Sequence, residues 1–215
     1  MKHINIFLIR HGFSCGNAKE GVIGQENESP LTDLGVEQAA LLAKRLQSED
    51  IQFDKIFSST YKRAKQTAEI LFPKSKIIFS DALVEYSPGD WRGKERAEIF
   101  SDPKNVEKMN NLQMDFVFPN GESLNQVARR MSSFIETNIL HNDELLAKIK
   151  DKKANVAVIS HGQSIKTFLK TVMDFNPSFC WKLRIENTSI TKLKYHPNKG
   201  WFIRSINDIA HLKNH

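Results

Sequence analysis

The chain has 215 residues, of which 40% are hydrophobic and 26% charged, and its formal net charge is +6. This length predicts one domain over residues 1–215 with a continuous core, and the composition excludes a disordered or low-complexity chain. The positive charge favours anionic partners, but no basic motif is interleaved with aromatic residues, which argues against nucleic acid as a partner.

The first half of the chain alternates strands and helices. Residues 4–9 (INIFLI) predict a buried strand that ends in a loop. Thr32 is a candidate N-cap, and the apolar residues behind it recur at helical spacing, which predicts an amphipathic helix over 33–47. A second strand near 54–58 leads into a helix over 61–71, which ends before Pro73.

The middle of the chain begins with a short predicted strand at 77–79 and an irregular stretch that contains Pro88, Gly89 and Gly93. We expect the longest helix to begin near Glu122, because apolar residues from Leu124 to Ile135 line one face. The β-branched segment 155–160 predicts another strand, and a helix over 162–173 follows it.

The chain closes with two predicted strands, at 190–193 and 201–206, joined by a Pro-Asn-Lys-Gly turn. Strands that alternate with helices predict an α/β fold, a three-layer α/β/α sandwich around a mostly parallel sheet. The densest basic cluster, Lys148–Lys153, lies between two predicted elements and is expected to form a solvated loop.

Membrane, secretory and metal-binding signals are not found in the sequence. No apolar run reaches the roughly 18 residues of a membrane span, and the N-terminus lacks the pattern of a secretory signal, so we expect a cytoplasmic protein. Cys15 and Cys180 are too few for a disulfide framework, and no Cys/His cluster has zinc-ligand spacing, so neither a metal nor another cofactor is expected. Cys15 is either a reactive thiol or a passive small residue, and free cysteines are more often passive.

Cationic and imidazole side chains follow three of the predicted strands. Arg10 and His11 follow the first strand, Arg63 comes shortly after the second, and His161 follows the strand at 155–160. Ligands of open α/β sheets bind beyond the carboxyl ends of the strands, so these side chains are expected to share one anion-binding pocket.

Such a pocket suits phosphoryl transfer. Negative charge spreads over three equatorial oxygens in the transition state, and the guanidinium groups of Arg10 and Arg63 offer bidentate donors to them. His161 and Asn17 are further candidate donors, and the N-termini of the helices after Ser59 and His161 would add backbone N–H groups. A neutral imidazole can attack phosphorus when its other nitrogen is held, which makes His11 the candidate nucleophile.

At these residues the chain resembles the histidine phosphatase superfamily, the phosphoglycerate mutase-like proteins. The resemblance covers residues 4–206 and is carried by these segments in this order: FLIRHGFSCGN, PLTDLGVEQA, FDKIFSSTYKRAKQTAEIL, LVEYSPGDWRG, NGES and VISHGQSIK. Each segment alone is modestly specific, whereas the ordered set is strong.

The resemblance implies a role for each matching residue. His11 is the nucleophile that becomes phosphorylated, Arg10, Arg63 and His161 bind the phosphate, and Glu85 donates a proton to the leaving group. Asn17 matches a position that touches the phosphate in relatives. Phe13 stands where many relatives carry Glu, a departure outside the catalytic positions that leaves the substrate open.

Three functions remain open at this point. The expected one is a metal-independent phosphatase that hydrolyses the phosphomonoester of a small molecule or a phosphoprotein. A mutase of the family would carry a longer insertion with paired arginines, whereas residues 94–118 contain only Arg96, and Arg129–Arg130 lie later in the chain. A non-catalytic phosphate-binding module on the same fold is the third possibility. The other histidines (His3, His141, His196, His211 and His215) are assigned no role, and Trp91 and Trp201 are expected in the core or a pocket wall.

Overall fold

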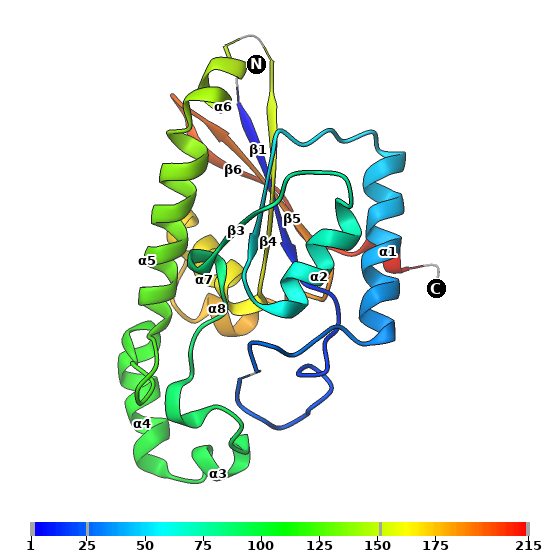
Figure 1. The fold of residues 1–215 in the computed structure, drawn as a ribbon. Helices are drawn as coiled ribbons and strands as arrows, with labels where there is room; N and C mark the ends of the chain where they lie inside the picture. The colour runs from blue at the N-terminus through cyan, green and yellow to red at the C-terminus, as the bar shows by residue number, and fades with distance from the viewer. Residues whose placement is uncertain (1–2, 25, 151, 214–215) are drawn as a thin grey trace.

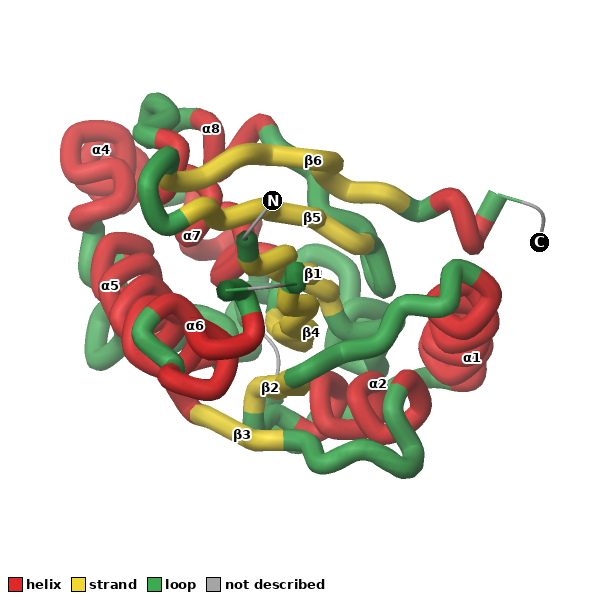
Figure 2. The backbone as a smooth tube through the Cα atoms, turned by 90° about the horizontal axis from the view of Figure 1, so that it is seen from above, coloured by secondary structure: helices red, strands yellow, loops and turns green. Residues whose placement is uncertain are grey.

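The computed structural model describes residues 3–24, 26–150 and 152–213. Six strands form one sheet in the order β3-β2-β4-β1-β5-β6 (Figures 1 and 2). Parallel pairing joins the first four strands of this order, whereas β5 pairs antiparallel with β1, and β6 antiparallel with β5. The strands are β1 (Ile4–Arg10), β2 (Lys55–Ser59), β3 (Ile78–Ser80), β4 (Ala154–Ser160), β5 (Ile190–His196) and β6 (Gly200–Asp208). The predicted α/β fold with a mostly parallel sheet is confirmed.

Helices cover both faces of the sheet (Figure 2). On one face lie α1 (Asp33–Ser48) and α2 (Lys62–Leu71), and on the other α5 (Leu124–Ile135) and α7 (Gly162–Met173). Successive side chains of β1 alternate between the two layers, as the pleat of a strand requires. Ile6 and Leu8 belong to the apolar cluster that includes residues of α5 and α7, while Phe7 and Ile9 belong to the cluster that includes residues of α1 and α2.

The helix starts follow their capping residues. Thr32 accepts a hydrogen bond from the backbone N of Gly35 at 3.2 Å, as the sequence predicts. Ser123 and Gln126 form a reciprocal capping box, so α5 begins at Leu124, near Glu122 as predicted. Its 12 residues continue into a π-helical turn over Glu136–Leu140. With this turn the continuous helix spans 124–140 and is longer than the 16 residues of α1, so the expectation that it is the longest helix is confirmed.

Four short helices were not predicted: α3 (Arg96–Phe100), α4 (Pro103–Leu112), α6 (Asp143–Lys148) and α8 (Phe179–Lys182). None of the α4 side chains is buried, so this helix carries no apolar stripe that a sequence pattern would reveal. Because Lys148 ends α6, the predicted loop over Lys148–Lys153 is corrected at its first residue. Short 3-10 turns complete the described fold at Asp81–Leu83, Gly89–Trp91, Gln113–Asp115 and Ala210–Leu212.

The pairing of β1 with β4 places the ends of these two strands side by side. Arg10 lies opposite Ser160 at the end of the ladder, so His11 and His161 leave neighbouring strands at the same level. The connection from β1 leads past β4 to β2, toward one edge of the sheet. The connection from β4 leads past β1 to β5, toward the opposite edge. This is the switch point at which open α/β sheets bind ligands. Over the described ranges no helix has both the length and the apolar character to cross a membrane.

Candidate active site

Two buried histidines form the centre of the site. The side chains of His11 and His161 are 2% and 0% exposed, and their ring centroids lie 5.0 Å apart. The backbone N of His11 donates to the carbonyl of Ser160 at 3.0 Å, which continues the strand pairing past the end of β1. This hydrogen bond fixes the main chain of His11 relative to β4.

The protonation of His11 follows from its two neighbours. Its Nδ1 lies 2.7 Å from the carbonyl oxygen of Gly12, which can only accept, so Nδ1 carries the hydrogen. Its Nε2 lies 3.2 Å from the Nε of Arg63, which can only donate. Burial, then the charges of Arg63 and Arg10, hold the pKa of His11 well below its usual range. The imidazole is therefore neutral, with the lone pair on Nε2.

The two arginines are held by backbone carbonyls. Arg63 is 1% exposed, and its Nη1 donates to the carbonyl of Glu26 at 3.0 Å. Burial lowers the pKa of Arg63 to about 10, so the side chain stays charged at neutral pH. Arg10 donates through Nη1 to the carbonyl of Ile185 at 2.6 Å, while its buried Nε finds no partner among the described residues. The pair places two fixed cations beside a neutral imidazole.

His161 lies deeper than His11 and is held by a hydroxyl group. Its Nε2 is 2.8 Å from the Oγ of Ser59, and its buried Nδ1 has no hydrogen-bond partner in the described structure. Burial is the main reason that the pKa of His161 lies well below its usual range, and Arg63 and His11 add to the effect. The uncharged ring is thus a candidate donor or acceptor and not a fixed cation.

Glu85 lies at the N-terminus of α7. Its Oε2 accepts from the backbone N of Gln163 at 3.0 Å, and its Oε1 accepts from the backbone N and Oγ of Ser164 at 3.0 and 3.1 Å. The expectation that these amides bind phosphate is therefore corrected, because the carboxylate already binds them. Backbone N–H groups at the start of α2 are also bound within the protein. The N of Tyr61 donates to the Oγ of Ser59, and the N of Lys62 donates to the carbonyl of Asn27.

A pocket of about 230 Å³ collects the predicted residues. It is lined by Arg10, His11, Gly16, Asn17, Lys19, Val22, Gly24, Arg63, Glu85 and Tyr86. Five of the six predicted site residues line it directly, and His161 lies behind them against the ring of His11. Burial, then the charge of Glu85, raises the pKa of Tyr86 to about 12, so its hydroxyl stays protonated. Within the described part of the chain, no group of three or more His, Cys, Asp or Glu side chains is arranged to hold a metal ion.

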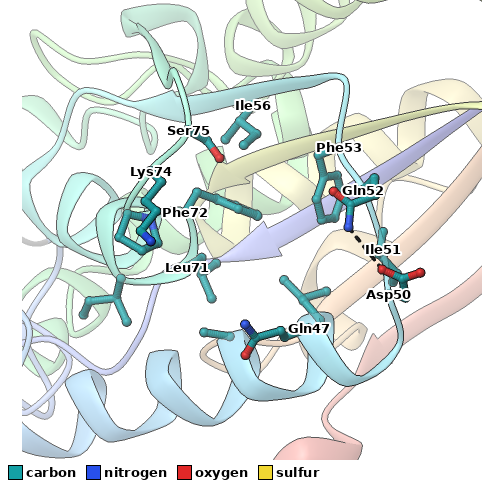
Figure 3. Close-up of a pocket in the computed structure, with 14 residues that line it drawn as sticks. Gln47, Asp50, Ile51, Gln52, Phe53, Ile56, Leu71, Phe72, Lys74 and Ser75 are labelled. Atoms are coloured by element: carbon teal, nitrogen blue, oxygen red, sulfur yellow. Dashed lines mark hydrogen bonds between the residues drawn. The ribbon is translucent and has the colours of Figure 1, made fainter.

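A larger cavity of about 490 Å³ lies elsewhere, between the C-terminal ends of α1 and α2 (Figure 3). Phe53, Leu71 and Phe72 form its apolar wall, and Asp50 and Gln52 are hydrogen-bonded to each other at its rim. None of its lining residues is an arginine or a histidine. The reactive side chains therefore identify the smaller pocket as the candidate site.

Three supporting residues escaped the sequence analysis. Asn187, in the turn before β5, donates to the carbonyl of His11 at 2.9 Å. Thr67 accepts from the backbone N of Gly12 at 3.0 Å, although it stands inside a recognised segment. Arg130 donates to the carbonyls of Ala82 and Glu85 and pairs with Glu122, so it braces the loop that carries Glu85. For Asn187, the sequence did offer a signal: the segment Asn-Thr-Ser directly before a predicted strand is typical of a turn.

Residues outside the site mostly follow expectation. Trp91 is buried in an aromatic cluster, and Trp201 packs against Phe168. Cys15 is exposed and has a free thiol. Of the histidines without a predicted role, His211 lies 3.0 Å from the Oγ1 of Thr188, and His215 lies outside the described residues.

The chain is similar in sequence and fold to known proteins. A family model for the histidine phosphatase superfamily (branch 1) matches residues 6–209. A Yersinia enterocolitica protein named probable phosphoglycerate mutase GpmB is 30% identical over 97% of this chain and 95% of its own length. Bacillus stearothermophilus YhfR has the same fold with a TM-score of 0.79, at 25% identity over 97% of this chain and 98% of that one. Phosphoserine phosphatase from Entamoeba histolytica, in complex with 3-phosphoglyceric acid, has a TM-score of 0.80 at 24% identity, covering 97% and 99%.

Proposed function

The chain belongs to the histidine phosphatase superfamily, and from this premise we propose that it is a phosphatase that hydrolyses a phosphomonoester through a phosphohistidine on His11. One observation carries the proposal: His11 is neutral, its Nδ1 is tied to the carbonyl of Gly12, and its Nε2 faces Arg63 at 3.2 Å in the pocket. This is the tautomer that a nitrogen nucleophile requires. Arg10 and Glu85 line the same pocket and complete the set of groups.

In the first step, the lone pair of His11 Nε2 attacks phosphorus as the bond to the leaving oxygen breaks. Arg10 and Arg63 neutralise the equatorial oxygens, and Asn17 and His161 add donors. Glu85 must take up a proton before this step, and it then gives that proton to the departing alkoxide. The products of the step are a free alcohol and phosphohistidine.

In the second step, water attacks the phosphorus of phosphohistidine. The Glu85 carboxylate takes a proton from this water as the P–N bond breaks, and inorganic phosphate leaves. His11 returns to its neutral form. No metal is needed in either step, because the two arginines supply the positive charge, so turnover should survive exhaustive chelation with EDTA. Loss of activity that an added divalent metal restores would contradict this reading of the pocket.

The covalent intermediate provides the direct test. Brief incubation with a ³²P-labelled phosphomonoester should trap an acid-labile, base-stable phosphoryl group, and His11→Ala should abolish both the trapping and turnover of p-nitrophenyl phosphate. Near wild-type turnover by His11→Ala would refute the mechanism. No turnover of any phosphomonoester by the wild-type protein would instead favour a phosphate-binding module.

A pocket of about 230 Å³ admits either a small phosphorylated metabolite or the phosphorylated side chain of a protein. The Entamoeba histolytica relative binds phosphoserine and 3-phosphoglyceric acid, both of which are small anionic phosphates. A panel of phosphorylated metabolites and phosphopeptides tests this choice. We treat residues 1–215 as a single catalytic domain for these experiments.

A mutase is the second candidate, and the 30% identity to a probable phosphoglycerate mutase favours it. Against it, the guanidinium of Arg96 lies over the ring of Phe100 at 5.3 Å, and Arg130 pairs with Glu122 at 2.9 Å. Neither lines the pocket, so no paired arginines are placed there to hold a substrate carboxylate. With 3-phosphoglycerate, we expect inorganic phosphate as the main product of any reaction. Efficient formation of 2-phosphoglycerate would place the chain with the mutases.

A further inference from the structure

The turn before β5 supports the main chain of the nucleophile. Thr188 has φ of 56°, a left-handed conformation that is a genuine outlier for a β-branched residue. It is completely buried, and its backbone N donates to the carbonyl of Arg10 at 3.0 Å and to that of His11 at 3.3 Å. Strain of this kind persists only where the surroundings impose it, and it is concentrated at functional sites.

The turn places the amide of Asn187 between two oxygen atoms. Asn187 is 9% exposed, and its Nδ2 donates to the carbonyl of His11 at 2.9 Å and to the Oδ1 of Asn17 at 3.2 Å. An amide nitrogen has two hydrogens, so both are used. Asn187 joins the nucleophile's main chain to a side chain of the pocket wall.

These contacts fix which way the amide of Asn17 points. Its Oδ1 lies 3.1 Å from both the backbone N and the Oγ of Ser14, in addition to the Nδ2 of Asn187. The two nitrogens can only donate, so the atom between them must be the oxygen. The amide nitrogen of Asn17 is therefore the atom that remains for a ligand in the pocket that this residue lines.

We infer that Asn187 is a positioning residue that holds the Asn17 amide with its nitrogen toward the phosphoryl group. The inference rests on the proposed function, since it takes the ligand of the pocket to be a phosphoryl group. The alternative is that Asn187 serves only to build the turn. The two roles differ in whether substitution of Asn187 changes anion binding through Asn17.

Asn187→Asp separates the two roles, because aspartate has nearly the same shape and no N–H. Its carboxylate would face the carbonyl of His11 and the Oδ1 of Asn17, so Asn17 would be repelled or would turn its oxygen toward the phosphoryl group. Asn187→Ala removes the same donors but leaves the two bonds from Ser14, so its effect should be smaller. Asn207→Asp is the matched control: the Oδ1 of Asn207 accepts from the backbone N of Glu186 at 2.6 Å, and aspartate keeps that acceptor.

The measurement is the dissociation constant of orthovanadate, determined by calorimetry on the full chain so that no turnover is needed. We expect Asn187→Asp to weaken binding about tenfold or more, Asn187→Ala to weaken it less, and Asn207→Asp to leave it unchanged. In an Asn17→Ala background, Asn187→Asp should weaken vanadate binding only about threefold or less, because Asn17, the residue through which Asn187 acts, is gone.

Two results would overturn the inference. One is that folded Asn187→Asp binds vanadate as tightly as the wild type. The other is that Asn187→Asp weakens vanadate binding as much in the Asn17→Ala background as in the wild type. If thermal melting shows that Asn187→Asp does not fold, the same comparison is made with Asn187→Ala, and the same two outcomes decide it. Failure of the proposed function is a separate result, seen as wild-type protein that binds vanadate but neither turns over p-nitrophenyl phosphate nor forms phosphohistidine.

Discussion

Arg63 donates from its Nε to the Nε2 of His11 at a distance of 3.2 Å, so the nitrogen expected to attack phosphorus is occupied by a guanidinium before substrate enters. A phosphoryl oxygen is a stronger acceptor for guanidinium than a neutral imidazole nitrogen is. In the proposed mechanism, a substrate that draws Arg63 to itself would therefore free the lone pair of His11 for attack.

Arg63→Ala should lower kcat/KM for p-nitrophenyl phosphate by about 10²–10³-fold, the range for the loss of one transition-state donor. Arg63→Lys should recover only part of the loss, because an ammonium group keeps the charge without the fixed pair of donors. Steady-state kinetics on both variants check this. Equal activity in Arg63→Lys and the wild type would show that charge alone matters at this position.

Acid should destabilise the fold beginning below about pH 6.5. Burial depresses the pKa of His11 and His161 in the folded state, whereas the unfolded chain titrates near 6.5. The unfolded state thus binds more protons at pH 5–6.5, and the free energy of unfolding falls by at most about 1.4 kcal/mol per pH unit for each histidine. Urea unfolding at several pH values measures the slope, which His161→Asn should reduce by about half. A free energy of unfolding that is constant between pH 7 and 5 would contradict the neutral, buried state of both rings.

Glu85→Gln should slow the hydrolysis of alkyl phosphates by about 10²–10⁴-fold, because an alkoxide leaves poorly without a proton. Formation of phosphohistidine from p-nitrophenyl phosphate should suffer far less, since p-nitrophenolate needs little help. A stopped-flow burst separates this step from the later hydrolysis. Equal losses in the phosphorylation step for both leaving groups would mean that Glu85 only positions substrate or holds the loop.

Asp81 and Asp90, two carboxylates close to Glu85 in the sequence, serve as controls for that experiment. Asp81 is exposed and accepts a hydrogen bond from Thr60, and Asp90 is exposed and accepts from Asn120 at 2.9 Å. Neither lines the pocket. Asp81→Asn and Asp90→Asn should therefore keep the wild-type dependence on the leaving group, and a lost dependence in either one would move the acid role to it.

Gly12→Ala should impair both stability and the chemical step. A Cβ on residue 12 would lie 2.5 Å from the carbonyl oxygen of Gly35, a backbone atom that no change of rotamer can move. Relief of this contact must displace the Gly12 carbonyl that holds His11 Nδ1, and overpacking of this kind costs about 1–3 kcal/mol. Urea unfolding and single-turnover kinetics measure the two effects.

Gly93→Ala is the control for Gly12→Ala. Gly93 has φ of 76°, and an added Cβ there meets nothing within 4 Å, so alanine introduces backbone strain without a clash. It should lower stability by about 1 kcal/mol and leave the single-turnover rate unchanged. A Gly12→Ala protein that matches Gly93→Ala in both measurements would show that the loop absorbs the added methyl group.

The sequence predicted the sheet and its flanking helices well, because the apolar residues form unbroken runs in the central strands and recur at helical spacing in the helices. INIFLI and NVAVIS are buried runs, and the observed strands Ile4–Arg10 and Ala154–Ser160 differ from prediction by one residue at an end. The helix over 162–173 was predicted with its observed limits. Short helices such as α4 were missed because an exposed helix needs no apolar stripe.

For the candidate site, the sequence identified the residues but not their hydrogen bonds. His11, Arg63 and Glu85 come from distant segments, and the family resemblance brought them together before any distance was known. The hydrogen bonds from the first backbone N–H groups of α7 to Glu85 were not predictable. A sequence does not show whether a helix N-terminus binds a nearby carboxylate or a phosphate. Asn187 was missed for a similar reason: its partners are a backbone carbonyl and a side chain 170 residues away.

The strand pairing also has a consequence for biosynthesis. Of the six strands, β1 is synthesised first. Its partners in the sheet are β4, which begins at Ala154, and β5, which begins at Ile190, so β1 cannot pair until these strands have been made. During that time the apolar segment Ile4–Ile9 is without the neighbours that bury its edges, and such a segment is prone to aggregate. The same delay means that His11 meets His161 only after β4 has been made, so a nascent chain that has not reached β4 cannot assemble the pocket.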